Sequence, residues 1–234
     1  MCRSELHRAY PFLFAYLVFL APDSLGPLVM DLRSRAYFRF WLITEPINWA
    51  FEILVVRELC GLVLARYKGL CSLGRWTMYA GIAISGAISL ASMLPRIPDA
   101  LSHRSRLLFY WYGADRGINF ALGIFLILMV LAASRYPVPV SRNVVLNASV
   151  FTAVFLSSTL ASLLRTVFDF RVSSQTNVML TAVNAASLAV WLFVLTPKGE
   201  EIRVELAHFH PEHETRILQR LDQINRLVLR LAER

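Results

Sequence analysis

Two carboxylates and an amide recur at helical spacing inside an apolar segment at about residues 38–65. Glu45, Asn48 and Glu52 are three and four residues apart, so a helix places them along one stripe. An ionised side chain in a membrane span costs about 2.5–3.5 kcal/mol on insertion scales and normally faces a bundle interior or an aqueous cavity. Glu52, near the middle of the segment, is therefore the main candidate for binding a ligand or an ion, or for proton transfer. The alternative is that these groups only join one helix to another.

A second cluster, formed by Asp115, Arg116 and Asn119, lies in a later apolar segment. At about 1.5 Å per residue, Arg116 lies at a depth between those of Glu45 and Glu52. We therefore expect Arg116 to pair with one of these two carboxylates.

Asparagines recur in two further apolar segments. Asn143 and Asn147 are four residues apart, and Asn177 and Asn184 are seven apart, so each pair shares one helix face. An interhelical hydrogen bond in a membrane contributes about 0.6–2 kcal/mol. We expect Asn147 and Asn184 either to join helices or to bind a ligand or an ion.

The residue types that would carry catalysis or hold a cofactor form no motif in the apolar segments. All five histidines lie outside them: His7, His103, His208, His210 and His213. A buried haem and an intramembrane Ser–His protease therefore have no candidate ligand or base. No HExxH, Walker A or GxGxxG motif occurs, and the three cysteines include no CxxC pair. The sequence assigns no catalytic residue, no metal and no cofactor; metal binding by the last three histidines is disfavoured because Pro211 interrupts any helical register.

The elements that must position these groups follow from the composition. Of the 234 residues, 56% are hydrophobic and 17% are charged, and the mean hydropathy is +0.52. In soluble domains, roughly 45–50% of residues are apolar and about 25% are charged. About 20 apolar residues cross the ~30 Å hydrocarbon core as a helix. Six segments are candidates, at about residues 9–30, 38–65, 76–94, 107–133, 143–165 and 174–196. The sequence thus predicts an all-α, polytopic transmembrane helix bundle of about six spans over residues 1–196.

The first segment leaves three interpretations open. Its apolar run, Pro11–Ala21, ends at Pro22, and Pro27 follows. Residues 9–30 therefore form a span, a signal peptide, or a helix that follows an earlier one.

Small residues repeat every four positions at Gly81, Ser85 and Ser89. This spacing predicts close packing between helices, either within the protein or between copies, with a pore wall as the alternative.

The formal net charge of +8 is explained by membrane topology rather than by nucleic acid binding. Most Lys and Arg residues outside the tail fall in the gaps between apolar segments, where they flank spans. Those near the spans number nine on the side of the N-terminus and eight on the opposite side. Five further arginines in the tail favour a cytoplasmic location for both ends. We expect a multi-pass protein of a bacterial cytoplasmic (inner) membrane.

The C-terminal tail divides into a polar linker at 197–211 and an amphipathic helix at 212–234. Apolar residues of the helix are spaced four and three residues apart and form a heptad seam: Ile217, Leu221, Ile224, Val228 and Leu231. A helix this short is marginal in isolation and must bury its seam. The partner predicted for it is the bilayer surface, a second copy of the chain or another helical protein.

Four short motifs resemble landmarks of a group of uncharacterised multi-pass integral membrane proteins of acidobacterial genomes. They begin at Tyr10 (YPFLFAY), Thr44 (TEP), Tyr136 (YPVPVSRN) and Gly199 (GE), and the resemblance extends over residues 10–201. It implies about seven spans, with one hydrophobic helix ahead of the first motif, and it carries no activity.

Two functional hypotheses follow. A membrane sensor or adaptor is favoured because a polar bundle interior is joined by a short linker to a heptad helix. A small transporter or channel that uses Glu52 and Arg116 is the alternative, although the sequence shows neither an internal repeat nor a pair of broken helices.

Overall fold

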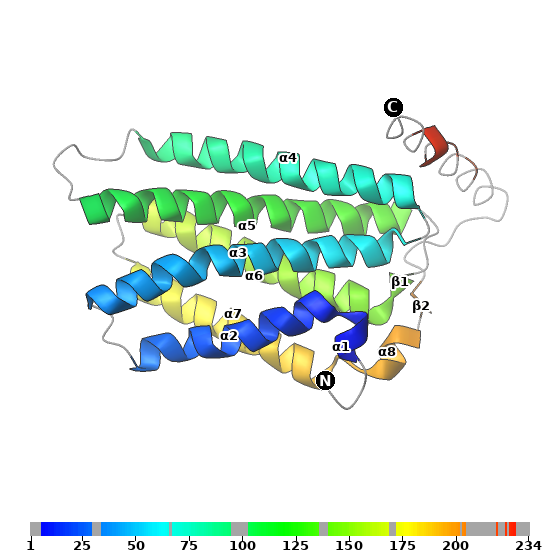
Figure 1. Ribbon diagram of the computed structural model, residues 1–234, viewed down its shortest axis with the longest axis horizontal. Helices are drawn as coiled ribbons and strands as arrows, with labels where there is room; N and C mark the ends of the chain where they lie inside the picture. Colours follow the sequence, from blue (N-terminus) through cyan, green and yellow to red (C-terminus); the bar gives the residue numbers. More distant parts are fainter. Residues whose placement is uncertain are drawn as a thin grey trace. The chain divides into compact units, whose positions relative to one another are not determined.

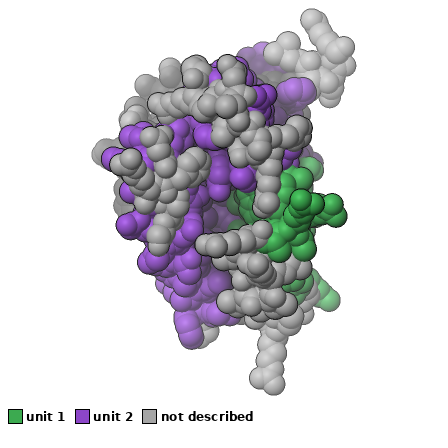
Figure 2. Space-filling model, turned by 90° about the vertical axis from the view of Figure 1, so that its left-hand side faces the viewer, with its two compact units in different colours: residues 1–59 green, residues 60–234 purple. Residues whose placement is uncertain are grey.

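The computed structural model describes most of the chain. The described residues are 6–29, 34–65, 67–94, 103–135, 140–168, 172–201, 203–204, 219, 223 and 225–227. By its internal contacts the chain divides into two compact units, residues 1–59 and 60–234 (Figure 2). Each unit is described by itself.

The first unit is helical. Its elements are α1 (Leu6–Ala9), α2 (Pro11–Val29) and most of α3 (Arg35–Val63). α2 begins at Pro11, because the fixed φ of proline suits the first position of a helix. It continues past Pro22, where the apolar run of the sequence ends. Phe19 and Phe51 hold α2 against α3, with ring centroids 5.2 Å apart.

The second unit is built on four long helices that alternate in direction, followed by a short helix and a strand (Figure 1). Its described elements are α4 (Lys68–Met93), α5 (His103–Arg135), β1 (Val140–Ser141), α6 (Arg142–Val167), α7 (Ser173–Phe193), α8 (Pro197–Glu201) and β2 (Arg203–Val204). α4 packs on α5, α5 on α6, and α6 on α7, so the order in space follows the order in the chain. β1 and β2 pair antiparallel, with Val140 opposite Val204.

Four helices in the described part of the chain are long and apolar enough to cross a membrane. They are α4, residues 106–134 of α5, α6, and residues 175–193 of α7. Only 17–44% of the apolar stretch in each is buried inside the protein. Large apolar side chains therefore face outward, including Ile88 at 65% exposure and Leu192 at 72%. Water opposes such exposure and lipid chains accept it, so this is a helical membrane protein, and the predicted all-α bundle is confirmed.

The other two predicted spans lie in the first unit. The apolar part of α2, Pro11–Pro22, is shorter than these four helices. α3 has 29 residues, which is long enough to cross, but its charged side chains keep it outside this group. Crossing of the membrane by residues 9–30 and 38–65 stays a prediction.

The core of the second unit is centred on α6. Phe151 and Phe155 are fully buried, and the Phe151 ring lies 5.0 Å from the ring of Trp191 on α7. On the other side of α6, a β-carbon added at Gly123 of α5 would lie 3.4 Å from the Leu156 side chain. α6 therefore has a helix packed on each side and is the most buried of the four candidate spans.

Part of the C-terminal tail lies among the described residues. α8 and β2 lie within the predicted linker at 197–211, and the described residues of the predicted C-terminal helix, 219, 223 and 225–227, are helical. The seam residues lie outside the described residues: Ile217, Leu221, Ile224, Val228 and Leu231. Burial of this seam stays a prediction.

Candidate functional site

The backbones of α4 and α5 touch at a pair of glycines. A β-carbon added at Gly117 would lie 2.7 Å from the Gly86 Cα and 2.9 Å from the Ser85 carbonyl oxygen. Side chains do not occupy such short distances, so Gly117 is required for this approach. The close contact does not use Gly81, the first residue of the predicted small-residue stripe, since a β-carbon there would have no neighbour within 4 Å. Gly86, one residue beyond Ser85, makes the contact instead.

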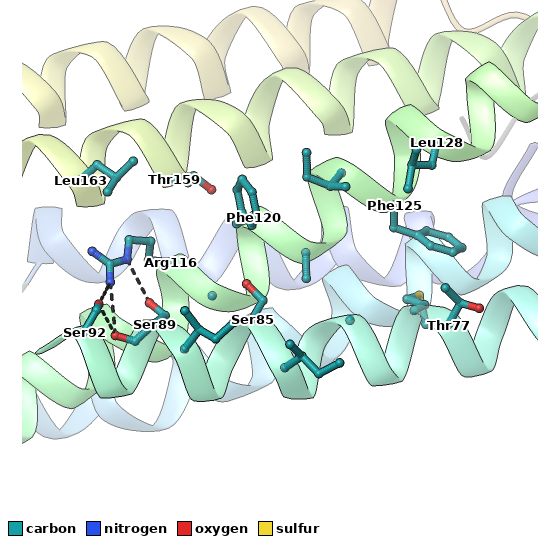
Figure 3. Close-up of a pocket in the computed structure, with 17 residues that line it drawn as sticks. Thr77, Ser85, Ser89, Ser92, Arg116, Phe120, Phe125, Leu128, Thr159 and Leu163 are labelled. Carbon is teal, nitrogen blue, oxygen red and sulfur yellow. Dashed lines mark hydrogen bonds between the residues drawn. The ribbon is translucent and has the colours of Figure 1, made fainter. Parts of the chain in front are cut away.

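Beside this contact, α4, α5 and α6 line an open groove of about 500 Å³ (Figure 3). This volume falls within the range of about 300–1,000 Å³ that is typical of small-molecule sites. Most of the wall is apolar and includes Ile84, Ile88, Phe120, Ile124 and Leu128. Serines of α4 at positions 85, 89 and 92 add hydroxyl groups to it. The groove thus offers an apolar surface with a polar margin.

Arg116 of α5 lies at one end of the groove (Figure 3). Its Nε donates to Ser89 Oγ at 2.9 Å, and its Nη2 donates to the Ser89 carbonyl at 3.2 Å and to Ser92 Oγ. Ser92 Oγ also donates to the Ser89 carbonyl, at 2.7 Å. These acceptors are neutral oxygens of α4, and the bonds orient the guanidinium toward that helix. Arg116 is therefore oriented by α4 at one end of a largely apolar groove.

Asp115 and Asn119 face a different neighbour. Asn119 Nδ2 donates to Asp115 Oδ1 at 2.7 Å and to the Asp115 carbonyl at 2.9 Å. Ser162 Oγ of α6 donates to Asp115 Oδ2 at 3.3 Å. Successive helical residues point about 100° apart, so Asp115 joins α5 to α6 while Arg116 joins α5 to α4. The residues of the predicted cluster Asp115, Arg116 and Asn119 are therefore neighbours in the sequence that contact different helices.

The polar stripe predicted on α3 is present in the first unit. Asn48 Nδ2 donates to Glu52 Oε1 at 3.0 Å, Glu52 is buried at 5% exposure, and Glu45 is half-buried. Arg116 belongs to the second unit, so its pairing with Glu45 or Glu52 stays a prediction.

Glu58 has a role that the sequence analysis missed. Its Oε1 accepts from the backbone N–H of Phe12 at 3.1 Å, and its Oε2 accepts from that of Leu13 at 3.1 Å. The first N–H groups of a helix have no partner within the helix, and a negative charge there is favourable. Glu58 therefore caps α2 from α3. Pro11 signals the start of a helix, but nothing in the sequence connects it to a carboxylate 47 residues later.

The predicted asparagines have three different surroundings. Asn143 Nδ2 donates to the Thr196 carbonyl at 2.8 Å and to Glu200 Oε2 at 3.3 Å, which ties α6 to the end of α7 and to α8. Asn147 is fully buried, and neither amide atom has a hydrogen-bond partner in the described part of the protein. Asn184 is exposed, and its part in helix pairing or in binding a ligand or ion stays a prediction.

Fold and groove together define a helical membrane protein with a laterally open, largely apolar groove that Arg116 lines. No protein family, curated protein or solved structure matches the chain.

Proposed function

We propose that the protein is a multi-pass membrane sensor or adaptor, in which the bundle binds a ligand from the bilayer and the C-terminal helix engages a partner. The observation that carries this proposal is that one helix, α4, contacts both the groove and the C-terminal segment. Ser89 and Ser92 near its C-terminal end hold Arg116 in the groove. Near its N-terminal end, Gly69 N donates to Asn225 Oδ1 of the C-terminal segment at 2.7 Å.

The bond to Asn225 acts as a cap supplied from outside the helix. Tyr67, at the N-cap position of α4, makes no side-chain capping bond, and Gly69 is one of the first residues, whose N–H groups have no partner within the helix. Asn225 satisfies this group. About 30 Å of continuous helix separate Gly69 from Ser89 at 1.5 Å per residue. A shift of α4 along α5 would therefore act on the groove and on the C-terminal segment together.

The rest of the proposal concerns topology and partner. The sequence pattern supports about six passes through a bacterial cytoplasmic membrane with both ends in the cytoplasm. The C-terminal helix then meets its partner, a second copy or another helical protein, on the cytoplasmic side.

Coupling along α4 is tested by hydrogen exchange on the full chain in lipid nanodiscs. Asn225→Ala should raise exchange at residues 68–71 about fivefold, since a net hydrogen bond contributes about 1 kcal/mol. Gln223→Ala, an exposed neighbour in the same segment, is the matched control and should leave exchange unchanged. Gly81→Leu, which adds a side chain in the groove, should change exchange at residues 68–71 in the wild-type background and not in Asn225→Ala. No response to Gly81→Leu would reject the sensor.

A small transporter or channel is the second candidate, and the burial of Glu52 favours it. In reconstituted vesicles, Glu52→Gln should then alter ion or proton flux, while Gln223→Ala should not. A wild-type protein without flux of any ion would reject this candidate.

A further inference from the structure

We propose that the guanidinium of Arg165, at the end of α6, binds the phosphate of an anionic phospholipid of the surrounding bilayer. Arg165 lies outside the groove between α4, α5 and α6, and its partners belong to α5 and α7. The site therefore goes beyond the sensor or adaptor proposed above and does not depend on it.

Three helices of the second unit position the Arg165 side chain. Its Nε donates to Thr176 Oγ1 of α7 at 3.1 Å, and its Nη2 donates to Asn177 Oδ1 at 2.6 Å. Its Cζ lies over the ring of Tyr112 of α5, 5.8 Å from the ring centroid. Thr176 is buried and Asn177 is exposed, so the guanidinium is held from the inner side and open toward the surface. A group that is already oriented loses little freedom when a ligand binds.

The bonds to α7 leave part of the guanidinium available. An arginine side chain carries five N–H donors, and the two bonds to α7 use one at Nε and one at Nη2. Neither bond uses Nη1. The partners of Arg165 in the described part of the chain, a hydroxyl, an amide oxygen and an aromatic ring, are all uncharged. The arrangement therefore orients a cation whose outer N–H groups can still donate.

Arg165 lies at the edge of the apolar layer rather than within it. The candidate span of α6 ends at Val167, two residues or about 3 Å of helix beyond Arg165, and that of α7 begins at Gln175. The end of α6 and the starts of α5 and α7 lie at the same end of the second unit (Figure 1). Tyrosine is typical of this level of a bilayer, which agrees with the position of Tyr112. The phosphates of a bilayer lie at the same level, next to the α6–α7 connection.

The chemistry of this place suits a phospholipid. A guanidinium binds phosphate through charge-assisted and often bidentate hydrogen bonds, and basic sites between membrane helices bind anionic head groups. From Asn177 onward, α7 offers the acyl chains an open surface, because only 17% of its apolar stretch is buried inside the protein and Val178 is 68% exposed. A lipid with its phosphate at Arg165 therefore places its chains along α7.

The test measures lipid bound to the full-length protein by native mass spectrometry. The protein is extracted from vesicles of phosphatidylcholine mixed with phosphatidylglycerol of the same chain length. The wild type should retain phosphatidylglycerol about tenfold over phosphatidylcholine, as one charge-assisted contact predicts. Arg165→Gln should lose this preference, and Arg165→Lys should keep part of it. Arg106→Gln removes the same charge from an exposed arginine where the α5 span begins, and it should keep the preference.

A second pair of variants leaves Arg165 in place. Asn177→Asp puts a carboxylate where the amide oxygen accepts from Nη2, so it retains the link between α6 and α7 while it neutralises the guanidinium. The preference for phosphatidylglycerol should then fall about as far as in Arg165→Gln. Gln175→Glu adds the same charge at an exposed position two residues earlier and is the matched control, which should keep the preference.

Three results would overturn the proposal. Equal retention of the two lipids by the wild type would show that Arg165 serves only to join α6 to α7. Equal losses within each pair, Arg165→Gln with Arg106→Gln and Asn177→Asp with Gln175→Glu, would show that diffuse surface charge attracts the lipid. Displacement of phosphatidylglycerol by inorganic phosphate at the same concentration would make a soluble anion the ligand of Arg165.

Discussion

Gly117 and Gly86 meet at the contact between α5 and α4, yet only Gly117 lacks room for a side chain. A β-carbon at Gly117 would lie 2.7 Å from the Gly86 Cα, whereas one at Gly86 would have no neighbour within 4 Å. The two glycines are therefore unequal, and the contact that shapes the groove depends on α5.

This asymmetry predicts that a change from glycine to alanine, which adds one methyl group, affects the stability of the protein differently at the two positions. Gly117→Ala should force α4 and α5 apart and destabilise the protein by about 1–3 kcal/mol, as overpacking does. Gly86→Ala is the matched control and should be neutral or slightly stabilising, because alanine favours a helix more than glycine. Thermal unfolding in detergent measures both. Equal melting temperatures for the two variants would contradict the close contact.

The cap of α2 predicts a local effect of Glu58. Glu58→Ala should leave the N–H groups of Phe12 and Leu13 without their acceptor and destabilise the first unit by about 1–2 kcal/mol. Hydrogen exchange at residues 12 and 13 should rise, while the exposed neighbour Arg57, replaced by alanine, should leave it unchanged. Unaltered exchange in Glu58→Ala would show that the carboxylate does not cap α2.

Asn143 and Gly199 form a coupled pair. A β-carbon at Gly199 would overlap Asn143 Oδ1 and lie 3.0 Å from its Cγ, so Gly199→Ala should displace the amide and break its bond to the Thr196 carbonyl. Each single variant, Gly199→Ala or Asn143→Ala, should cost about 1–3 kcal/mol. The double variant should cost clearly less than the sum, because the clash is removed. Additive changes in the free energy of unfolding would argue against the pair.

The buried amide of Asn147 predicts that its replacement raises the stability of the protein, whereas the changes above lower it. Its amide is fully buried, and neither atom has a partner among the described residues. Asn147→Leu keeps the volume and removes the desolvation cost, so it should stabilise the protein by about 1 kcal/mol. Asn143→Leu, one turn away, should destabilise it. Loss of stability in Asn147→Leu would show that an ordered water or another partner satisfies the amide.

The sequence by itself determined the helical membrane character and the approximate position of four candidate spans, those of α4 to α7. These features depend on local properties, namely the length of apolar runs, the prolines and arginines that bound them, and helical periodicity. The Asn48–Glu52 pair belongs to the same class, since four residues of one helix suffice to bring the two side chains together.

Tertiary structure decided which way each helix turns its polar residues. Arg116 faces α4 while Asp115 faces α6, and Asn184 faces outward although Asn147 faces inward. The cap that Glu58 places on α2 joins residues about 45 positions apart. Periodicity defines a face of a helix but not the neighbour that it meets, because the rotation of each helix follows from side-chain packing along its whole length.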